Sequence, residues 1–168
     1  MDADRLITAF IGAFLGAAGW LVVGLYMQRR QFDRQARNAA RAVYFELAMN
    51  IIDIDVAHRH SIFGRLRRDS FDRLLPELAT WLDADELQTI ARAYMSHAGY
   101  DQLQRDSSVP AQVRTALLER VLDEHRAAAD LLRRRAFSRT EAARLAGDES
   151  GAAKAARIES DNERVVHG

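Results

Sequence analysis

Residues 36–57 read ARNAARAVYFELAMNIIDIDVA. Within this stretch, apolar or small side chains recur at alternating spacings of three and four residues, which is the period of one face of an α-helix. The positions on that face are Ala36, Ala40, Val43, Leu47, Asn50, Ile54 and Ala57. No glycine or proline lies between Gly24 and Gly64, so the pattern predicts one long amphipathic helix over residues 28–63.

Two kinds of packing fit this helical face. It can be the inner face of a bundle within one chain, or the seam of a coiled coil with a second copy, in which one inward asparagine sets the register. The side chains that we expect to pack against the bundle or a partner are Val43, Leu47, Asn50 and Ile54. Bulky neighbours widen the stripe at Tyr44, Phe45, Ile51 and Ile52. This width favours a bundle over a narrow two-stranded seam.

Toward the N-terminus the same helix continues into an uncharged segment, residues 6–27. At about 1.5 Å per residue, a helix of this length covers the roughly 30 Å hydrocarbon core of a bilayer. A cleaved signal peptide is the main alternative, but Asp2 and Asp4 stand where such a peptide is basic, and the apolar run continues past any small-residue cleavage site. We therefore predict an uncleaved, single-pass transmembrane helix.

Basic residues cluster directly after this segment, with Asp33 as the one acid among them. The cluster consists of Arg29, Arg30, Arg34, Arg37 and Arg41. Because arginine is retained on the cytoplasmic side, we predict an inner-membrane protein of a bacterium with its N-terminus outside and its C-terminal domain in the cytoplasm. These arginines are also expected to contact anionic lipid headgroups, at about 1 kcal/mol each.

Two glycines inside the predicted span, Gly12 and Gly16, form a GxxxG pair. Small residues at this spacing let two helix backbones approach closely in lipid, so the pair predicts a homodimer or a higher homo-oligomer. The alternative is that glycine and alanine are simply common in transmembrane helices.

Residues 64–137 carry the signals of further helices. Ser70 is a possible cap for a short helix that Pro76 limits or replaces with a new one. Asp83 and Glu86 form an aspartate version of the capping box, which predicts a helix running to about His97, before Gly99.

The last apolar helical pattern begins near Pro110 and runs to about Phe137. The fold class that follows is all-α, with the transmembrane helix continuing into a cytoplasmic bundle of three to four helices. Residues 138–168 are rich in alanine and polar groups, so we predict a disordered or frayed helical tail there.

Composition excludes several kinds of chemistry. The 168 residues include 24 basic and 24 acidic side chains and no cysteine. The absence of cysteine excludes disulfides, thiolate catalysis and cysteine-ligated metals. A net charge of zero gives no general attraction for nucleic acid, so we expect no nucleic-acid partner.

The titratable residues form no catalytic or metal-binding pattern. His58 and His60 are two apart, which points them away from each other on a helix. His125 lies on an apolar stripe, where we expect a hydrogen bond to a buried partner such as Asn50 or Tyr94. We predict no enzyme activity, no metal and no cofactor.

The function expected from this architecture is a membrane-anchored, non-enzymatic interaction or scaffold module that engages a cytoplasmic protein. One alternative is a membrane-perturbing effector for lysis or phage defence, loosely resembling a single-span holin, whose span oligomerises. A second alternative is a membrane-tethered enzyme whose site the sequence does not reveal.

Overall fold

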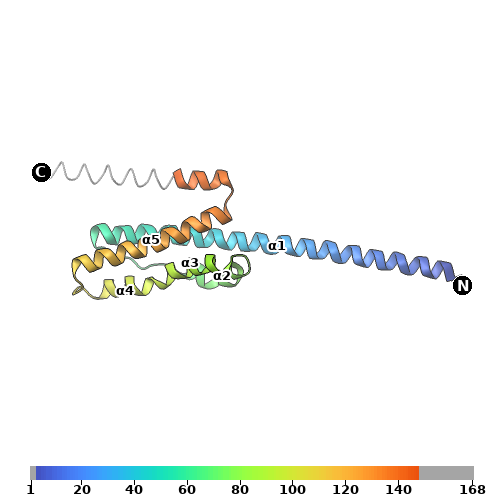
Figure 1. Ribbon diagram of the computed structural model, residues 1–168, viewed down its shortest axis with the longest axis horizontal. Helices are drawn as coiled ribbons and strands as arrows, with labels where there is room; N and C mark the ends of the chain where they lie inside the picture. The colour runs from blue at the N-terminus through green and yellow to red at the C-terminus, as the bar shows by residue number, and fades with distance from the viewer. Residues whose placement is uncertain (1–2, 148–168) are drawn as a thin grey trace.

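A computed structural model describes residues 3–147, with side chains described at Gly16 and from residue 19 onward. This part of the chain is all α, as predicted, and holds no strand (Figure 1). Its helices are α1 (Ala3–His60), α2 (Asp69–Ala79), α3 (Ala84–Met95), α4 (His97–Arg105) and α5 (Ala111–Ala136). A further helical segment covers residues 139–147. The predicted count of three to four bundle helices was therefore too low.

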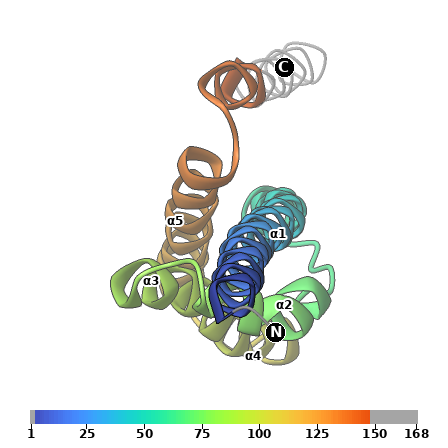
Figure 2. The ribbon, with the colours of Figure 1, turned by 90° about the vertical axis from the view of Figure 1, so that its right-hand side faces the viewer.

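Helix α1 is the axis of the molecule. Its C-terminal half packs mainly against α5 and α2, whereas its N-terminal half projects beyond the bundle (Figure 1). The end-on view shows α1 and α5 next to each other, with α2, α3 and α4 covering one side of the pair (Figure 2). The bundle is therefore assembled around the C-terminal half of one long helix.

The predicted membrane span is only partly represented among the described side chains. Among those residues, no helix is apolar over a length sufficient to cross a membrane. Residues 6–15, 17 and 18 of the span, which include Gly12, have side chains outside the described set. The backbone of the span belongs to α1, which continues without interruption into the bundle.

The inner face of α1 packs within its own chain. Val43 and Leu47 are fully buried in one apolar cluster with α2, α3 and α5, and Ile54 is fully buried in a second cluster with α4 and α5. Asn50 is also fully buried. This face is not available as a coiled-coil seam, because the rest of the chain already covers it.

Asn50 has a different role from the register-setting asparagine of a coiled coil. Its amide nitrogen donates to the Arg67 carbonyl oxygen (2.8 Å), and its amide oxygen accepts from the Arg67 backbone N–H (2.8 Å). This pair of hydrogen bonds fastens the connection between α1 and α2. α1 itself ends at His60, three residues before the predicted limit, because Ser61 adopts a left-handed backbone with φ 55°.

The predicted break at Pro76 does not occur. Pro76 lies inside α2, which continues to Ala79. A proline removes only one helical N–H donor, and buried Phe71 and Leu78 hold both ends of this short helix against the core. Packing therefore outweighs the local preference of the proline.

The junction between α3 and α4 differs in the same way. The capping box is confirmed, since the Glu86 N–H donates to Asp83 Oδ1 (2.9 Å) and the Asp83 N–H donates to Glu86 Oε2 (3.2 Å). However, α3 ends at Met95, and Gly99, the predicted terminator, lies inside α4. Only Ser96 separates the two helices.

The chain directly after α5 is helical again over residues 139–147. Ser138 and Glu141 form a second capping box, in which the Ser138 N–H donates to Glu141 Oε2 (2.8 Å) and the Glu141 N–H donates to Ser138 Oγ (3.3 Å). The helical segment at 139–147 follows, and Leu145 packs against the core. The rest of the predicted tail, residues 148–168, lies outside the described residues.

Candidate functional site

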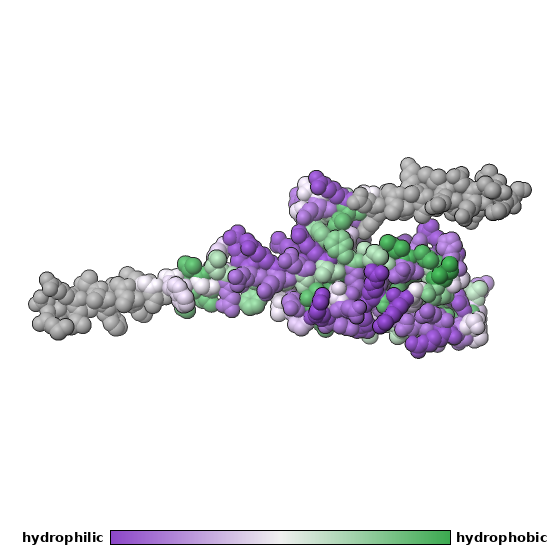
Figure 3. Space-filling view, turned by 180° about the vertical axis from the view of Figure 1, so that it is seen from behind, coloured by the Kyte–Doolittle hydropathy of each residue, from purple (hydrophilic) through white to green (hydrophobic). Residues whose placement is uncertain are grey.

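α1 carries a second apolar stripe on the side opposite its buried face. We call Ala42, Phe45, Met49, Ile52 and Val56 the outer stripe; these residues have the same three- and four-residue spacing as the inner face. The exposed fractions of Phe45, Met49 and Ile52 are 52%, 40% and 56%. Seen from behind, the bundle shows apolar areas among its polar ones (Figure 3). Ala42 and Val56 at its ends are half-buried, so the exposed part of the stripe is centred on Phe45, Met49 and Ile52.

The projecting part of α1 is apolar over residues 19–27 of its described side chains. Exposed side chains there include Trp20, Leu21, Val22, Val23, Leu25, Tyr26 and Met27, with Phe32 further along. They follow one another around the whole circumference of the helix, so no single packing face could cover them. A Cβ added at Gly16 would meet nothing within 4 Å, which leaves that side of the backbone open.

The five predicted lipid-contacting arginines divide into two groups. Arg29, Arg30, Arg34 and Arg37 are exposed on the projecting part of α1 and its junction with the bundle. Arg41 is engaged within the chain. Its Nε donates to the Ala136 carbonyl oxygen (3.1 Å), its Nη2 pairs with Glu141 (3.2 Å), and its guanidinium lies 5.0 Å from the Phe137 ring centroid. Arg41 therefore holds the chain after α5 against α1.

Glu46 brings a buried carboxylate into the bundle. Its oxygens accept hydrogen bonds from the Ser70 N–H (2.7 Å), the Phe71 N–H (3.2 Å) and the Tyr94 hydroxyl (2.7 Å). α2 has no side-chain cap of its own, so Glu46 caps it from another helix. Burial, and then the hydrogen bond to Glu46, raise the pKa of Tyr94. The predicted cap, Ser70, contributes its backbone and not its side chain.

A pair of histidines lies deeper in the same region. His97 Nε2 and His125 Nε2 are 3.1 Å apart, and the two rings are stacked with 6° between their planes. His125 Nδ1 is 2.8 Å from the Val121 carbonyl oxygen, which can only accept, so the proton of His125 is on Nδ1 and His97 donates from Nε2. Burial lowers the pKa of both rings. For His97 the electrostatic effect of His125 adds to burial, and the pKa falls to about 4.

The sequence suggested Asn50 or Tyr94 as the hydrogen-bond partner of His125. In the structure its ring nitrogens instead bond to His97 and to the Val121 carbonyl oxygen. No group of three metal-ligating side chains is present among the described residues, and no carboxylate bonds to either histidine of the pair. The histidines and Glu46 are cross-links of the core. One sequence signal could have indicated Glu46: it stands among Val43, Tyr44 and Leu47, which belong to the predicted apolar stripe.

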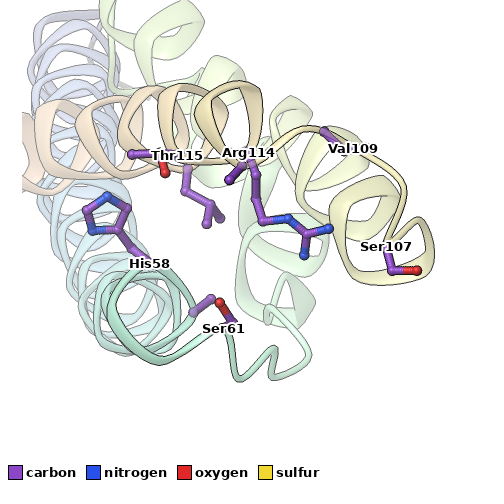
Figure 4. A pocket seen from close by; sticks show the side chains of 9 residues that line it. His58, Ser61, Ser107, Val109, Arg114 and Thr115 are labelled. Atoms are coloured by element: carbon purple, nitrogen blue, oxygen red, sulfur yellow. The ribbon is translucent and has the colours of Figure 1, made fainter.

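A polar pocket lies at the end of the bundle where α1 ends and α5 begins. We call it the distal pocket; its volume is about 420 Å³, and its lining includes Ala57, His58, Ser61, Ser107, Arg114 and Leu118. Figure 4 shows the Arg114 side chain extending from α5 into the space between Ser61 and Ser107, with His58 on the other side. Sequence analysis did not predict this grouping, because its residues come from three separate segments.

Arg114 makes no ion pair among the described residues. Its Nη2 donates to the Asp106 carbonyl oxygen (3.1 Å), and its guanidinium lies 5.8 Å from the Phe63 ring centroid. Neither contact neutralises its charge. His58 of the pocket lining has its Nε2 3.8 Å from Oε1 of Glu119, which lies outside the lining.

Comparison of the chain with protein-family models, with curated proteins and with solved structures found no match.

Proposed function

We propose that this chain is a membrane-anchored, non-enzymatic interaction module, in which residues 6–27 hold the helical bundle at the cytoplasmic face of a bacterial inner membrane. The observation that carries the proposal is the course of α1. One helix runs from Ala3 to His60, exposes apolar side chains around its projecting part, and then becomes the central element of the bundle.

The exposed apolar side chains support a lipid environment for the projecting part. Leaving apolar surface in water costs about 25 cal/mol per Å², and Trp20 alone is 79% exposed. A bilayer would cover every side of the helix at once, which a single protein partner would not. The exposed arginines at 29, 30, 34 and 37 follow the apolar part directly, where anionic headgroups would lie.

The outer stripe supports self-association as the mode of interaction. At 3.6 residues per turn, Gly16 and Phe45 lie within about 20° of each other around the axis of α1. The open backbone at Gly16 and the outer stripe therefore share one side of one unbroken helix. Two copies anchored in the same membrane would be parallel, and both surfaces would meet their counterparts along a single twofold axis. We assign the outer stripe to a second copy of this chain.

Cysteine crosslinking in membranes tests both parts of this proposal, since the chain has no cysteine of its own. Ile52→Cys places a thiol in the outer stripe. Leu117→Cys is the matched control, because Leu117 is also an exposed apolar residue of the bundle but lies on α5. We expect the protein in the membrane fraction and a disulfide-linked dimer from Ile52→Cys alone.

Two outcomes would contradict the proposal. Recovery of the full chain from the soluble fraction without detergent would remove the anchor. Membrane-bound protein with equal crosslinking at both positions, or with none at Ile52→Cys, would leave an anchor without the proposed self-association.

A further inference from the structure

We propose that the distal pocket binds a small soluble organic anion, whose carboxylate or phosphate group pairs with Arg114 and whose short apolar body lies against the pocket wall. This inference goes beyond the anchoring and self-association proposed above. It rests on the side chains that three separate segments of the chain bring to one cavity (Figure 4).

The charge of Arg114 is available to a ligand. Its two contacts, the Asp106 carbonyl oxygen and the Phe63 ring, orient the guanidinium without neutralising it. The nearby Asp106 carboxylate is already engaged, because its Oδ1 accepts from the Ser108 N–H (2.9 Å) and the Ser108 hydroxyl (2.6 Å). These bonds, and after them the charge of Arg114, lower the pKa of Asp106. The Asp106 carboxylate thus acts on Arg114 electrostatically but forms no ion pair with it, so the Arg114 donors other than the one to the Asp106 carbonyl oxygen can face a ligand. A guanidinium with free donors binds carboxylate and phosphate oxygens in particular.

The remaining lining suits an anion with an apolar part. Hydroxyl groups of Ser61, Ser107 and Thr115 can each donate a hydrogen bond to an anionic oxygen. Ala57 and Leu118 add a buried apolar wall. The volume of about 420 Å³ is within the range of small-molecule sites, which combine apolar walls with a few placed polar groups.

The backbone at Ser61 is a separate observation at this pocket. Its φ of 55° is the only positive value at a non-glycine residue in the described part of the chain. Left-handed backbone is uncommon for serine and is enriched at functional sites. Here it ends α1 and turns Ser61 into the pocket wall.

The position of the pocket favours a soluble ligand over a lipid headgroup. Ala57 lies about 45 Å along α1 from Met27, the predicted end of the membrane span. In an upright molecule, headgroups of the same membrane do not reach that far. This step rests on the proposed anchor, whereas the binding chemistry does not.

Titration of the detergent-solubilised full chain with three probes tests the proposal. Butyrate supplies a carboxylate with an apolar body, inorganic phosphate supplies an anionic group alone, and butan-1-ol is a neutral control of similar size. We expect saturable binding of butyrate, phosphate or both, measured by ligand-observed NMR, and none of butan-1-ol. Stronger binding of butyrate would identify a carboxylic acid as the ligand class, and stronger binding of phosphate a phosphorylated compound.

Two arginine variants separate the site from general charge. Arg114→Gln should weaken binding by at least about tenfold, because it removes a charged hydrogen-bond donor. Arg120→Gln, on the same helix but paired with Glu124 at the surface, should stay within about twofold of the wild type. Ala111 is an exposed residue of the pocket lining, and Ala111→Phe places a ring there without removing a polar group. This variant should abolish binding, and it provides an independent test in case Arg114→Gln does not fold.

The proposal is wrong if neither anion binds saturably to the wild type. It is equally wrong if butan-1-ol binds as tightly as butyrate, or if Ala111→Phe leaves the affinity for both anions unchanged.

Discussion

The two stripes of α1 have the same spacing and similar residue types, yet one is buried and the other is exposed at three of its five positions. Leu47 on the inner face is fully covered by α2, α3 and α5, whereas Ile52 on the outer stripe retains 56% of its exposure. Periodicity alone therefore locates a helix face but not its partner. The chain's own helices α2, α3, α4 and α5 cover the inner face, whereas on the outer stripe, within the described part of the chain, only Phe45 meets another ring from beyond α1, that of Phe137.

The largest expected difference between the two stripes is in stability. Leu47→Ala should lower the free energy of unfolding by about 3 kcal/mol, because it opens a cavity in a fully buried cluster. Ile52→Ala should cost less than about 1 kcal/mol for the isolated chain. Chemical denaturation of the full chain in detergent, followed by circular dichroism, measures both. Similar losses would mean that the outer stripe is also part of the monomer core.

The next largest effect is expected at Glu46, the buried carboxylate beside the inner face. Glu46→Ala should cost about 2 to 3 kcal/mol, since it leaves two backbone N–H groups of α2 and the Tyr94 hydroxyl without their acceptor. Tyr94→Phe removes only one of these three hydrogen bonds and should cost about 1 kcal/mol. The same denaturation experiment ranks the two. A smaller loss for Glu46→Ala than for Tyr94→Phe would contradict the capping role of Glu46.

The buried histidine pair predicts a dependence of stability on pH. The pKa of His97 falls from 6.5 to about 4 in the folded bundle. Between these values the unfolded chain binds more protons than the folded chain, so stability is full above pH 6.5 and is lost as the pH falls toward 4. For a shift of this size the expected loss is about 2 to 3 kcal/mol.

His97→Gln should flatten this dependence, whereas His60→Gln, at an exposed position, should leave it unchanged. Urea denaturation at a series of pH values from 7 to 4 makes the comparison. If the wild type and His97→Gln have parallel profiles, the buried pair is not the source of the pH dependence.

The smallest expected effect is at the edge of the outer stripe. Arg41→Ala should lower stability by about 0.5 to 1 kcal/mol, because its ion pair with Glu141 is largely exposed to solvent. The same change should raise amide hydrogen exchange in residues 139–147, which Arg41 holds against α1. Arg37→Ala, on the same helix but outside this contact, is the control. Unchanged exchange in the Arg41 variant would show that Phe137 and Leu145 hold the segment without it.

The local signals that sequence reasoning identified correctly are those satisfied within one element. The absence of glycine and proline between residues 24 and 64 determined the unbroken helix, and Asp83 with Glu86 determined where α3 begins. Ser138 and Glu141 form the same kind of signal, which was overlooked because the residues after them have few bulky apolar groups. Signals based on a single residue, at Pro76 and Gly99, failed because core packing outweighed their local preference.

The sequence by itself determined an all-α chain, a long amphipathic first helix and the starts of its capped helices, because hydrogen bonds and periodicity within a helix depend on residues three or four apart. Only the tertiary structure decided which stripe of α1 is buried, that Glu46 caps α2, that His97 is the partner of His125, and that Arg114 lines a pocket with Ser61. These contacts join residues far apart in the chain, and their geometry follows from the packing of whole helices and not from any local spacing.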